Sequence, residues 1–172
     1  PIQHRDFVEE ALTRARYWAR SMLGWPRFRD FEPNAAHHAL ASWRQVSGLI
    51  TQNVDGLHHK AGSSPSKIVE IHGNTRRAMC LSCDWRDDIE VVLDRVRAGD
   101  VDPVCEVCGG ILKSATISFG QALVAEDLER VFRVPRHSCK EPEQQRHVGL
   151  DLDEQARQTG EQIVIARREI HA

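Results

Sequence analysis

The sequence predicts an α/β protein with parallel strands, joined to a small metal-binding lobe. Two observations support this prediction. Segments with strand-like and helix-like apolar patterns alternate along the chain, and two Cys-x-x-Cys pairs stand near its middle. The 172 residues are enough for one domain with a full core and too few for two full-sized domains.

Two helices are predicted before the first strand. Apolar residues recur at three- and four-residue spacing over residues 6–18, which is the pattern of one helix face. The Gly-Trp-Pro triplet at 24–26 predicts a break after this helix. Asn34 is a suitable N-cap for a second helix that runs to about Val46.

Strand-like segments follow the second helix. Residues 48–51 indicate a short buried strand, and residues 67–72 indicate the next one, stopped by the Gly-Asn pair at 73–74. The remaining predicted elements are helices at 87–98 and 126–133, a strand at 111–119 and a short β-like run at 162–166. This alternation favours parallel strands connected by helices.

Four of the five cysteines form the pairs Cys80-Leu-Ser-Cys83 and Cys105-Glu-Val-Cys108. Each tight turn can direct two thiolates inward, which suits a tetrahedral zinc ion. Because cysteine would fill all four positions, no coordination site would remain for a catalytic water, and the metal would be structural. Two disulfides are the alternative, which a reducing compartment disfavours. Cys139 lies outside the pattern.

Charge and hydropathy limit the classes of partner. Lys and Arg number 23 and Asp and Glu number 25, for a formal net charge of −2. This balance gives no reason to expect nucleic acid or an anionic membrane as partner. No apolar run approaches the roughly 20 residues of a membrane span, and the first residues lack a signal-peptide pattern. We therefore expect a cytoplasmic protein.

Two polar loops follow buried strands at 48–51 and 67–72. Ligands of open α/β sheets bind beyond the carboxyl ends of strands. Gln52, Asn53 and Asp55 can form hydrogen bonds with an amide or a ribose, and His72 can act as a general base near neutral pH. The alternative is structural, since Asn-x-Asp-Gly is a common turn sequence.

Taken in order, these segments resemble the sirtuin (Sir2) family of NAD-dependent protein deacylases. The resemblance covers about residues 1–133. The segments that support it are Ile50–His58, Ala61-Gly62, Glu70–Asn74, the four-cysteine module, Ile117–Gly120 and, ahead of them, Pro33–His37.

The resemblance implies an incomplete Rossmann-like parallel sheet with a small helical and zinc-ribbon lobe, the zinc module lying at about residues 78–112. It implies cleavage of the nicotinamide–ribose bond of NAD and transfer of the acyl group from an acyl-lysine to ADP-ribose. His72 would be the general base, and the acyl-lysine peptide would bind beside Phe119-Gly120. The implied cofactor-binding residues are Gln52, Asn53 and Asp55, and the implied zinc ligands are Cys80, Cys83, Cys105 and Cys108.

The family's Gly-rich loop for the NAD phosphates belongs upstream of Pro1, and its Gly-Thr-Ser turn should follow at about Arg133. The resemblance therefore implies truncation at both ends relative to the family, with residues 134–172 an unmatched, poorly packed tail. The alternative function is that of a catalytically inactive relative, either a zinc-containing binding module or a non-functional fragment. We expect a monomer.

Overall fold

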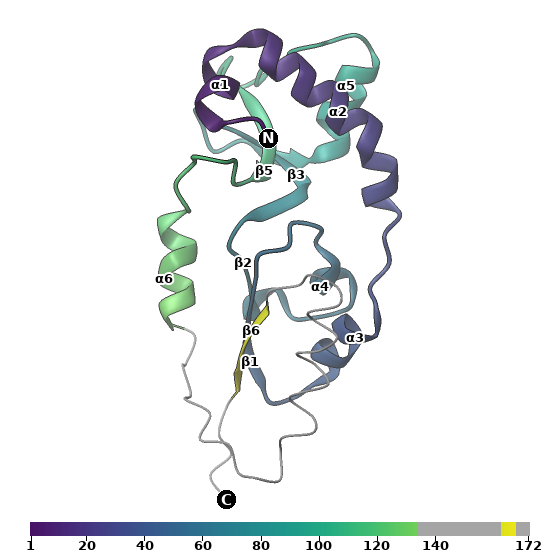
Figure 1. Ribbon diagram of the computed structural model, residues 1–172, viewed down its shortest axis with the longest axis vertical. Coiled ribbons are helices and arrows are strands. Elements are labelled where there is room, and N and C mark those ends of the chain that lie inside the picture. Colours follow the sequence, from purple (N-terminus) through teal and green to yellow (C-terminus); the bar gives the residue numbers. More distant parts are fainter. Residues whose placement is uncertain (134–162, 168–172) are drawn as a thin grey trace, which may run out of the picture. The chain divides into compact units, whose positions relative to one another are not determined.

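The structure, a computed structural model, describes residues 1–133 and 163–167 (Figure 1). The chain divides into two compact units. The first combines Pro1–Phe31 with Gly73–Ala122, and the second combines Glu32–His72 with Leu123–Ala172. Among the described residues, every helix is too short or too polar to cross a membrane.

Three helices belong to the first unit: α1 (His4–Glu9), α2 (Ala11–Arg29) and α5 (Ile89–Arg97). The predicted break at residues 24–26 is wrong, because α2 continues through it and the chain breaks at Glu10 instead. Tertiary contacts outweigh the unfavourable triplet. Trp25 is buried in the core, and the guanidinium of Arg76 donates hydrogen bonds to the carbonyls at the end of α2.

The sheet of the first unit is antiparallel, in the order β4-β3-β5. Its strands are β3 (Gly73–Cys80), β4 (Arg86–Asp88) and β5 (Leu112–Thr116). The Gly-Asn pair at 73–74 was predicted to stop a strand but begins β3, because Gly73 turns the chain with a φ of +79° and then pairs with Thr116. The buried core of this unit comprises Trp18, Trp25, Ala78, Cys80, Ile89, Val92, Leu93, Cys105 and Leu112.

The sheet of the second unit has the order β2-β1-β6. Its strands are β1 (Val46–Thr51), β2 (Ile68–Glu70) and β6 (Ile163–Arg167). The predicted parallel pairing is confirmed for β1 and β2, where Thr51 lies opposite Glu70. The strand β6 runs antiparallel to β1 on its other side. The carboxyl ends of β1 and β2 therefore meet at one edge of the sheet.

The helices of the second unit are α3 (Ala35–Ser42), α4 (Leu57–Lys60), a 3₁₀ turn (Pro65–Lys67) and α6 (Ala125–Arg133). The predicted cap is confirmed. The Asn34 side chain accepts a hydrogen bond from the backbone N–H of His37. The His37 ring in turn accepts a hydrogen bond from the backbone N–H of Asn34. The helix ends before the predicted Val46, because that residue already begins β1. A small core of Leu40, Val46, Leu49 and Ile68 fills this unit.

The expectations for the C-terminal part fall mostly outside the described residues. The β-like run predicted at 162–166 corresponds to β6. The polar and charged segment expected before it lies at residues 134–162, which the structure does not describe.

Candidate active site and metal centre

The two polar loops identified in the sequence lie at neighbouring strand ends. The loop with Gln52, Asn53 and Asp55 follows β1, and His72 comes two residues after β2. The backbone N–H of Ile71 donates to the carbonyl of Thr51 at 3.0 Å, which extends the strand pairing into this region. Because His72 follows β2 closely and β2 pairs in parallel with β1, His72 lies at the start of the Gln-Asn-Val-Asp loop.

The contact between the two loops fixes the orientation of the imidazole. The Nδ1 atom of His72 lies 3.2 Å from the backbone carbonyl oxygen of Gln52. A carbonyl oxygen can only accept, so Nδ1 carries the hydrogen in this contact and Nε2 keeps a lone pair. An imidazole held in this tautomer can take a proton at Nε2.

The loop after β1 is held by its own polar groups. The Asp55 carboxylate accepts from the backbone N–H of Leu57 at 2.9 Å, and the N–H of Asn53 donates to the Thr51 hydroxyl at 3.0 Å. Gly56 has a φ of +71°, which this turn requires. The Asn-x-Asp-Gly sequence therefore forms a turn, as its composition predicts. It leaves the Gln52 side chain exposed and those of Asn53 and Asp55 half-buried.

Three further histidines of the second unit, on α3 and α4, make specific contacts. His59 lies 3.5 Å from the carboxylate of Glu70, at the end of β2, and hydrogen bonding to that carboxylate raises the pKa of His59. The rings of His37 and His58 are buried and pack with centroids 4.6 Å apart. The ring of His37 also accepts from the backbone N–H of Asn34 as part of the capping box of α3, so this histidine has a structural role.

In the first unit the four cysteines converge. Their sulfur atoms all lie within 4.8 Å of one another, and three of the pairs are 3.4–3.7 Å apart: Cys83–Cys108 at 3.4 Å, Cys80–Cys108 at 3.5 Å and Cys83–Cys105 at 3.7 Å. A tetrahedral zinc ion with Zn–S bonds of about 2.3 Å requires sulfur atoms about 3.8 Å apart. A disulfide requires about 2 Å, and all four cysteines are free. The geometry therefore fits the metal centre and not the disulfide alternative.

Backbone groups around the cluster are arranged for thiolates. The N–H of Ser82 donates to the sulfur of Cys80 at 3.3 Å, and that of Gly110 donates to the sulfur of Cys108 at 3.4 Å. Gly109 has a φ of +75°, a backbone conformation that glycine adopts without steric cost. A Cβ on Gly110 would lie 2.8 Å from the Cys80 sulfur. Glycine is needed at both positions, for conformation at one and for space at the other.

The cysteines of the cluster differ in their pKa values. Burial alone would raise the pKa of Cys80, but hydrogen bonds from the Ser82 N–H and the Cys108 thiol lower it to about 7. The pKa of Cys83 is raised to about 12 and that of Cys108 is also raised, with hydrogen bonding to neighbouring cysteines contributing at each. A bound zinc ion would require the cysteines to lose their protons, because the thiolate is the form that ligates the metal.

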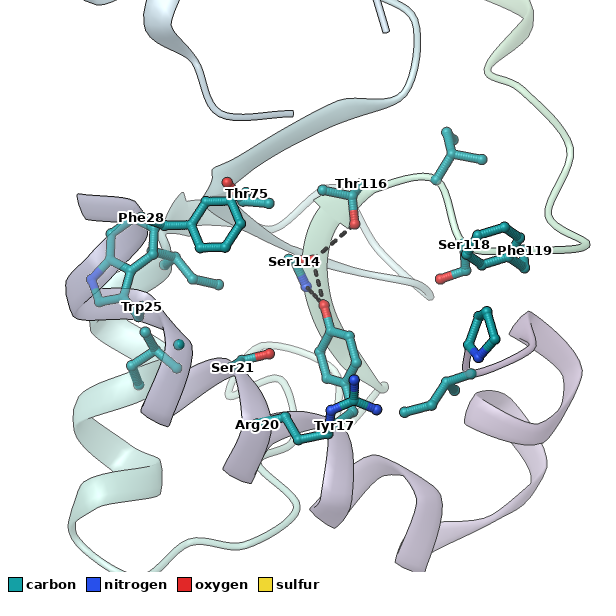
Figure 2. A pocket seen from close by; sticks show the side chains of 16 residues that line it. Tyr17, Arg20, Ser21, Trp25, Phe28, Thr75, Ser114, Thr116, Ser118 and Phe119 are labelled. Carbon is teal, nitrogen blue, oxygen red and sulfur yellow. Dashed lines mark hydrogen bonds between the residues drawn. The ribbon is translucent and has the colours of Figure 1, made fainter. Parts of the chain in front are cut away.

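The first unit contains a cavity that was not predicted from the sequence. This cavity is lined by α2, α5, β5 and the segment after β5 (Figure 2). Tyr17, Ser114 and Thr116 form a hydrogen-bonded series there. These residues are distant in the sequence and of common types, so no local pattern could have indicated them. Phe119, expected to border a peptide cleft, also lines this cavity.

These features define the class of protein: an α/β protein that has polar loops at the ends of a parallel strand pair and a four-cysteine centre suited to zinc. The chain belongs to the Sir2 family, whose model matches residues 2–141. This confirms the resemblance and the fold class predicted from the sequence.

Named relatives agree with this assignment. The chain is 38% identical over 160 residues to "NAD-dependent protein deacylase Sirt4" of Drosophila melanogaster, covering 76% of this chain and 51% of the relative. It is 37% identical over 161 residues to an "NAD-dependent protein deacetylase" of Xanthomonas campestris pv. campestris (strain 8004), covering 77% and 54%. The chain thus spans about half the length of the curated relatives it matches.

Solved structures give the same result. A structure described as a Sir2 homolog–NAD complex matches with a TM-score of 0.62 and 29% identity, covering 76% of this chain and 49% of that one. Another, described as Sir2 bound to acetylated peptide, matches with a TM-score of 0.65 and 25% identity, covering 74% and 52%.

Proposed function

We propose that this chain acts in NAD-dependent removal of acyl groups from lysine side chains of proteins. Nicotinamide would be released and the acyl group transferred to ADP-ribose. The observation that supports this most directly is the contact of His72 with the Gln52 carbonyl at the joined ends of β1 and β2. Membership of the Sir2 family and the printed activities of its relatives support the same proposal.

In this proposal His72 is the general base. Its Nδ1–H is directed to the Gln52 carbonyl, so Nε2 can accept a proton from a ribose hydroxyl. The side chains of Gln52, Asn53 and Asp55 bind the ribose and nicotinamide, since amide and carboxylate groups can satisfy hydroxyls and a carboxamide. When bound, NAD supplies the nicotinamide–ribose bond that the reaction breaks.

We assign Cys80, Cys83, Cys105 and Cys108 as ligands of one structural zinc ion. The spacing of their sulfur atoms and the backbone N–H groups directed at two of them support this assignment. With four thiolates bound, the ion has no position for water. Its role is therefore to hold the two knuckles together rather than to take part in the reaction.

The proposal is tested by nicotinamide release from NAD with an acetyl-lysine peptide, using the zinc-loaded chain. His72→Ala should abolish release, because no other group would take the proton. His38→Ala is the matched control, since that imidazole is exposed on α3, and it should leave release unchanged. A thermal shift on addition of NAD measures cofactor binding separately.

Equal release by wild type and His72→Ala would refute the role of His72. A zinc-loaded chain with no thermal shift and no release would instead support the alternative, a catalytically inactive zinc-containing module. These outcomes differ in a measurable way, because zinc content is determined independently in each case.

We further propose that residues 1–133 form the catalytic region, with the zinc module at about 78–112 and residues 134–172 outside it. The proposed partner is an acyl-lysine peptide or protein, bound by a monomer. The net charge of −2 supports the absence of a nucleic-acid partner. Four free thiols at the metal centre support a reducing compartment, and we propose the cytoplasm.

A further inference from the structure

The single-turn helix α4 (Leu57–Lys60) follows the loop that carries Gln52, Asn53 and Asp55. Its N-cap is Gly56, whose left-handed conformation turns the chain from the loop into the helix. A helix of four residues is too short to be stable by itself. Its side chains must therefore fix its position against the neighbouring elements, and with it the position of the loop.

Three consecutive side chains of α4 make these contacts. Leu57 is buried, and the buried ring of His58 packs on the ring of His37 in α3, with centroids 4.6 Å apart. The next residue, His59, contacts β2: its Nε2 atom lies 3.5 Å from a carboxylate oxygen of Glu70. The two histidines thus connect α4 to α3 and to the end of β2.

Strand pairing places Glu70 close to His72 along the same edge of the sheet. Glu70 is the last residue of β2 and lies opposite Thr51 of β1. The chain continues this pairing beyond the strand, and the Nδ1 atom of His72 lies 3.2 Å from the Gln52 carbonyl oxygen. The polar loop is therefore tied to this strand end twice, at its start through His72 and beyond its end through the contact of His59 with Glu70.

The contact between His59 and Glu70 is polar and partly buried. The side chain of Glu70 is 17% exposed and that of His59 is 36% exposed. Hydrogen bonding to the Glu70 carboxylate raises the pKa of His59, against the opposing effect of burial. Both the neutral and the charged imidazole can donate from Nε2 to this carboxylate. The adjacent charged side chain of α4, that of Lys60, bonds instead to Glu32 ahead of α3.

We propose that His59 and Glu70 are positioning residues, whose contact holds the polar loop after β1 against the strand end that carries His72. A partly exposed ion pair contributes little to global stability. The contact therefore acts on local geometry, by keeping the His72 ring on the Gln52 carbonyl. Its consequence for catalysis rests on the proposed function, in which His72 is the general base. The geometric coupling itself does not.

The tautomer of His72 is the readout, because it depends on the bond between Nδ1 and the Gln52 carbonyl. It is measured by ¹⁵N NMR of the zinc-loaded full chain at about pH 8, where most imidazoles are neutral. The His72 signals are identified by their absence in His72→Ala. Wild type should carry the ring hydrogen mainly on Nδ1. His59→Ala and Glu70→Ala should each make Nε2–H the major form, since the loop then loses its second attachment to β2.

Further variants distinguish positioning from a general loss of structure. Glu70→Gln keeps an acceptor oxygen for His59 and should retain the Nδ1–H form of His72. Lys60→Ala removes the neighbouring charged contact of the same helix and should also retain it. The double variant of His59→Ala and Glu70→Ala should shift the tautomer no further than either single variant, because both remove the same contact. If Glu70→Ala fails to fold, His59→Ala and Glu70→Gln keep the proposal testable.

Nicotinamide release measures the consequence for the proposed reaction. His59→Ala should lower kcat about ten-fold, because a displaced loop misplaces the base relative to the ribose. The KM for the acetyl-lysine peptide should stay within about two-fold of wild type, since the contact supports the loop proposed to bind the cofactor. Lys60→Ala should leave both constants unchanged.

Each outcome has a defined meaning. An unchanged tautomer in His59→Ala and Glu70→Ala overturns the proposal, whatever the activity of the chain. An equal change in Lys60→Ala also overturns it, because the effect would not belong to this contact. A shifted tautomer with an unchanged kcat overturns the catalytic part. A shifted tautomer in a chain whose wild type releases no nicotinamide contradicts the proposed function and leaves the positioning role intact.

Discussion

Gly73→Ala should destabilise the first unit through two separable effects. Gly73 has a φ of +79°, and an alanine in this left-handed region costs about 1–2 kcal/mol. The new Cβ would also lie 2.0 Å from the carbonyl oxygen of Ala115, so the backbone of β3 or β5 must shift. Loss of the Gly73–Thr116 pairing would add about 1–2 kcal/mol from one or two hydrogen bonds. The total is about 3 kcal/mol.

Gly99→Ala isolates the conformational effect. Gly99 has a φ of +102°, but an added Cβ would meet no atom within 4 Å. We expect a loss of about 1–2 kcal/mol there. Urea unfolding of the zinc-loaded chain, followed by the fluorescence of Trp18 and Trp25 in the core of the same unit, gives both values. If Gly73→Ala costs no more than Gly99→Ala, the steric argument is wrong.

The other predictions concern the metal centre and the buried amine. Cys83→Ser should lower bound zinc well below one ion per chain by elemental analysis, whereas Cys139→Ser should retain it; equal zinc contents would contradict the assignment. Gly110→Ala should release zinc to a chelator more than ten-fold faster than wild type, since its Cβ would lie 2.8 Å from the Cys80 sulfur; an unchanged rate would show that the space is not needed. Burial lowers the pKa of Lys113 from 10.5 to about 8. Between pH 8 and pH 10.5 the unfolded chain therefore binds more protons than the folded chain. The free energy of unfolding should rise with pH over this interval, by up to about 3 kcal/mol. Urea midpoints of wild type and Lys113→Met should separate over this interval, and parallel curves would refute the buried ammonium.

The sequence predicted those parts of the site that depend on short-range order. The two Cys-x-x-Cys pairs have a spacing that only a few geometries satisfy, and the structure brings their sulfur atoms together. The loops after β1 and β2 were predicted from strand ends, and parallel pairing places His72 against Gln52. The roles of these residues in binding and catalysis remain predictions.

Features that depend on contacts between residues far apart in the sequence could not be predicted. The helix α2 passes through an unfavourable triplet because Trp25 and Arg76 stabilise its end, and Arg76 lies on a strand far along the chain. Gly73 looked like a strand terminator because its contact with Ala115 is invisible locally. The cavity series joins Tyr17 to Ser114, so it exists only after α2 packs on β5.

The strand β6 has a consequence for how the protein behaves at high concentration. It pairs with β1 on the side opposite β2, so the unpaired backbone groups of β1 do not face solvent along that side. An open strand of this kind can recruit a strand from another molecule and seed aggregation. Strand β6 thus covers this side of β1, and a chain that lacks residues 163–167 should be more prone to self-association through β1.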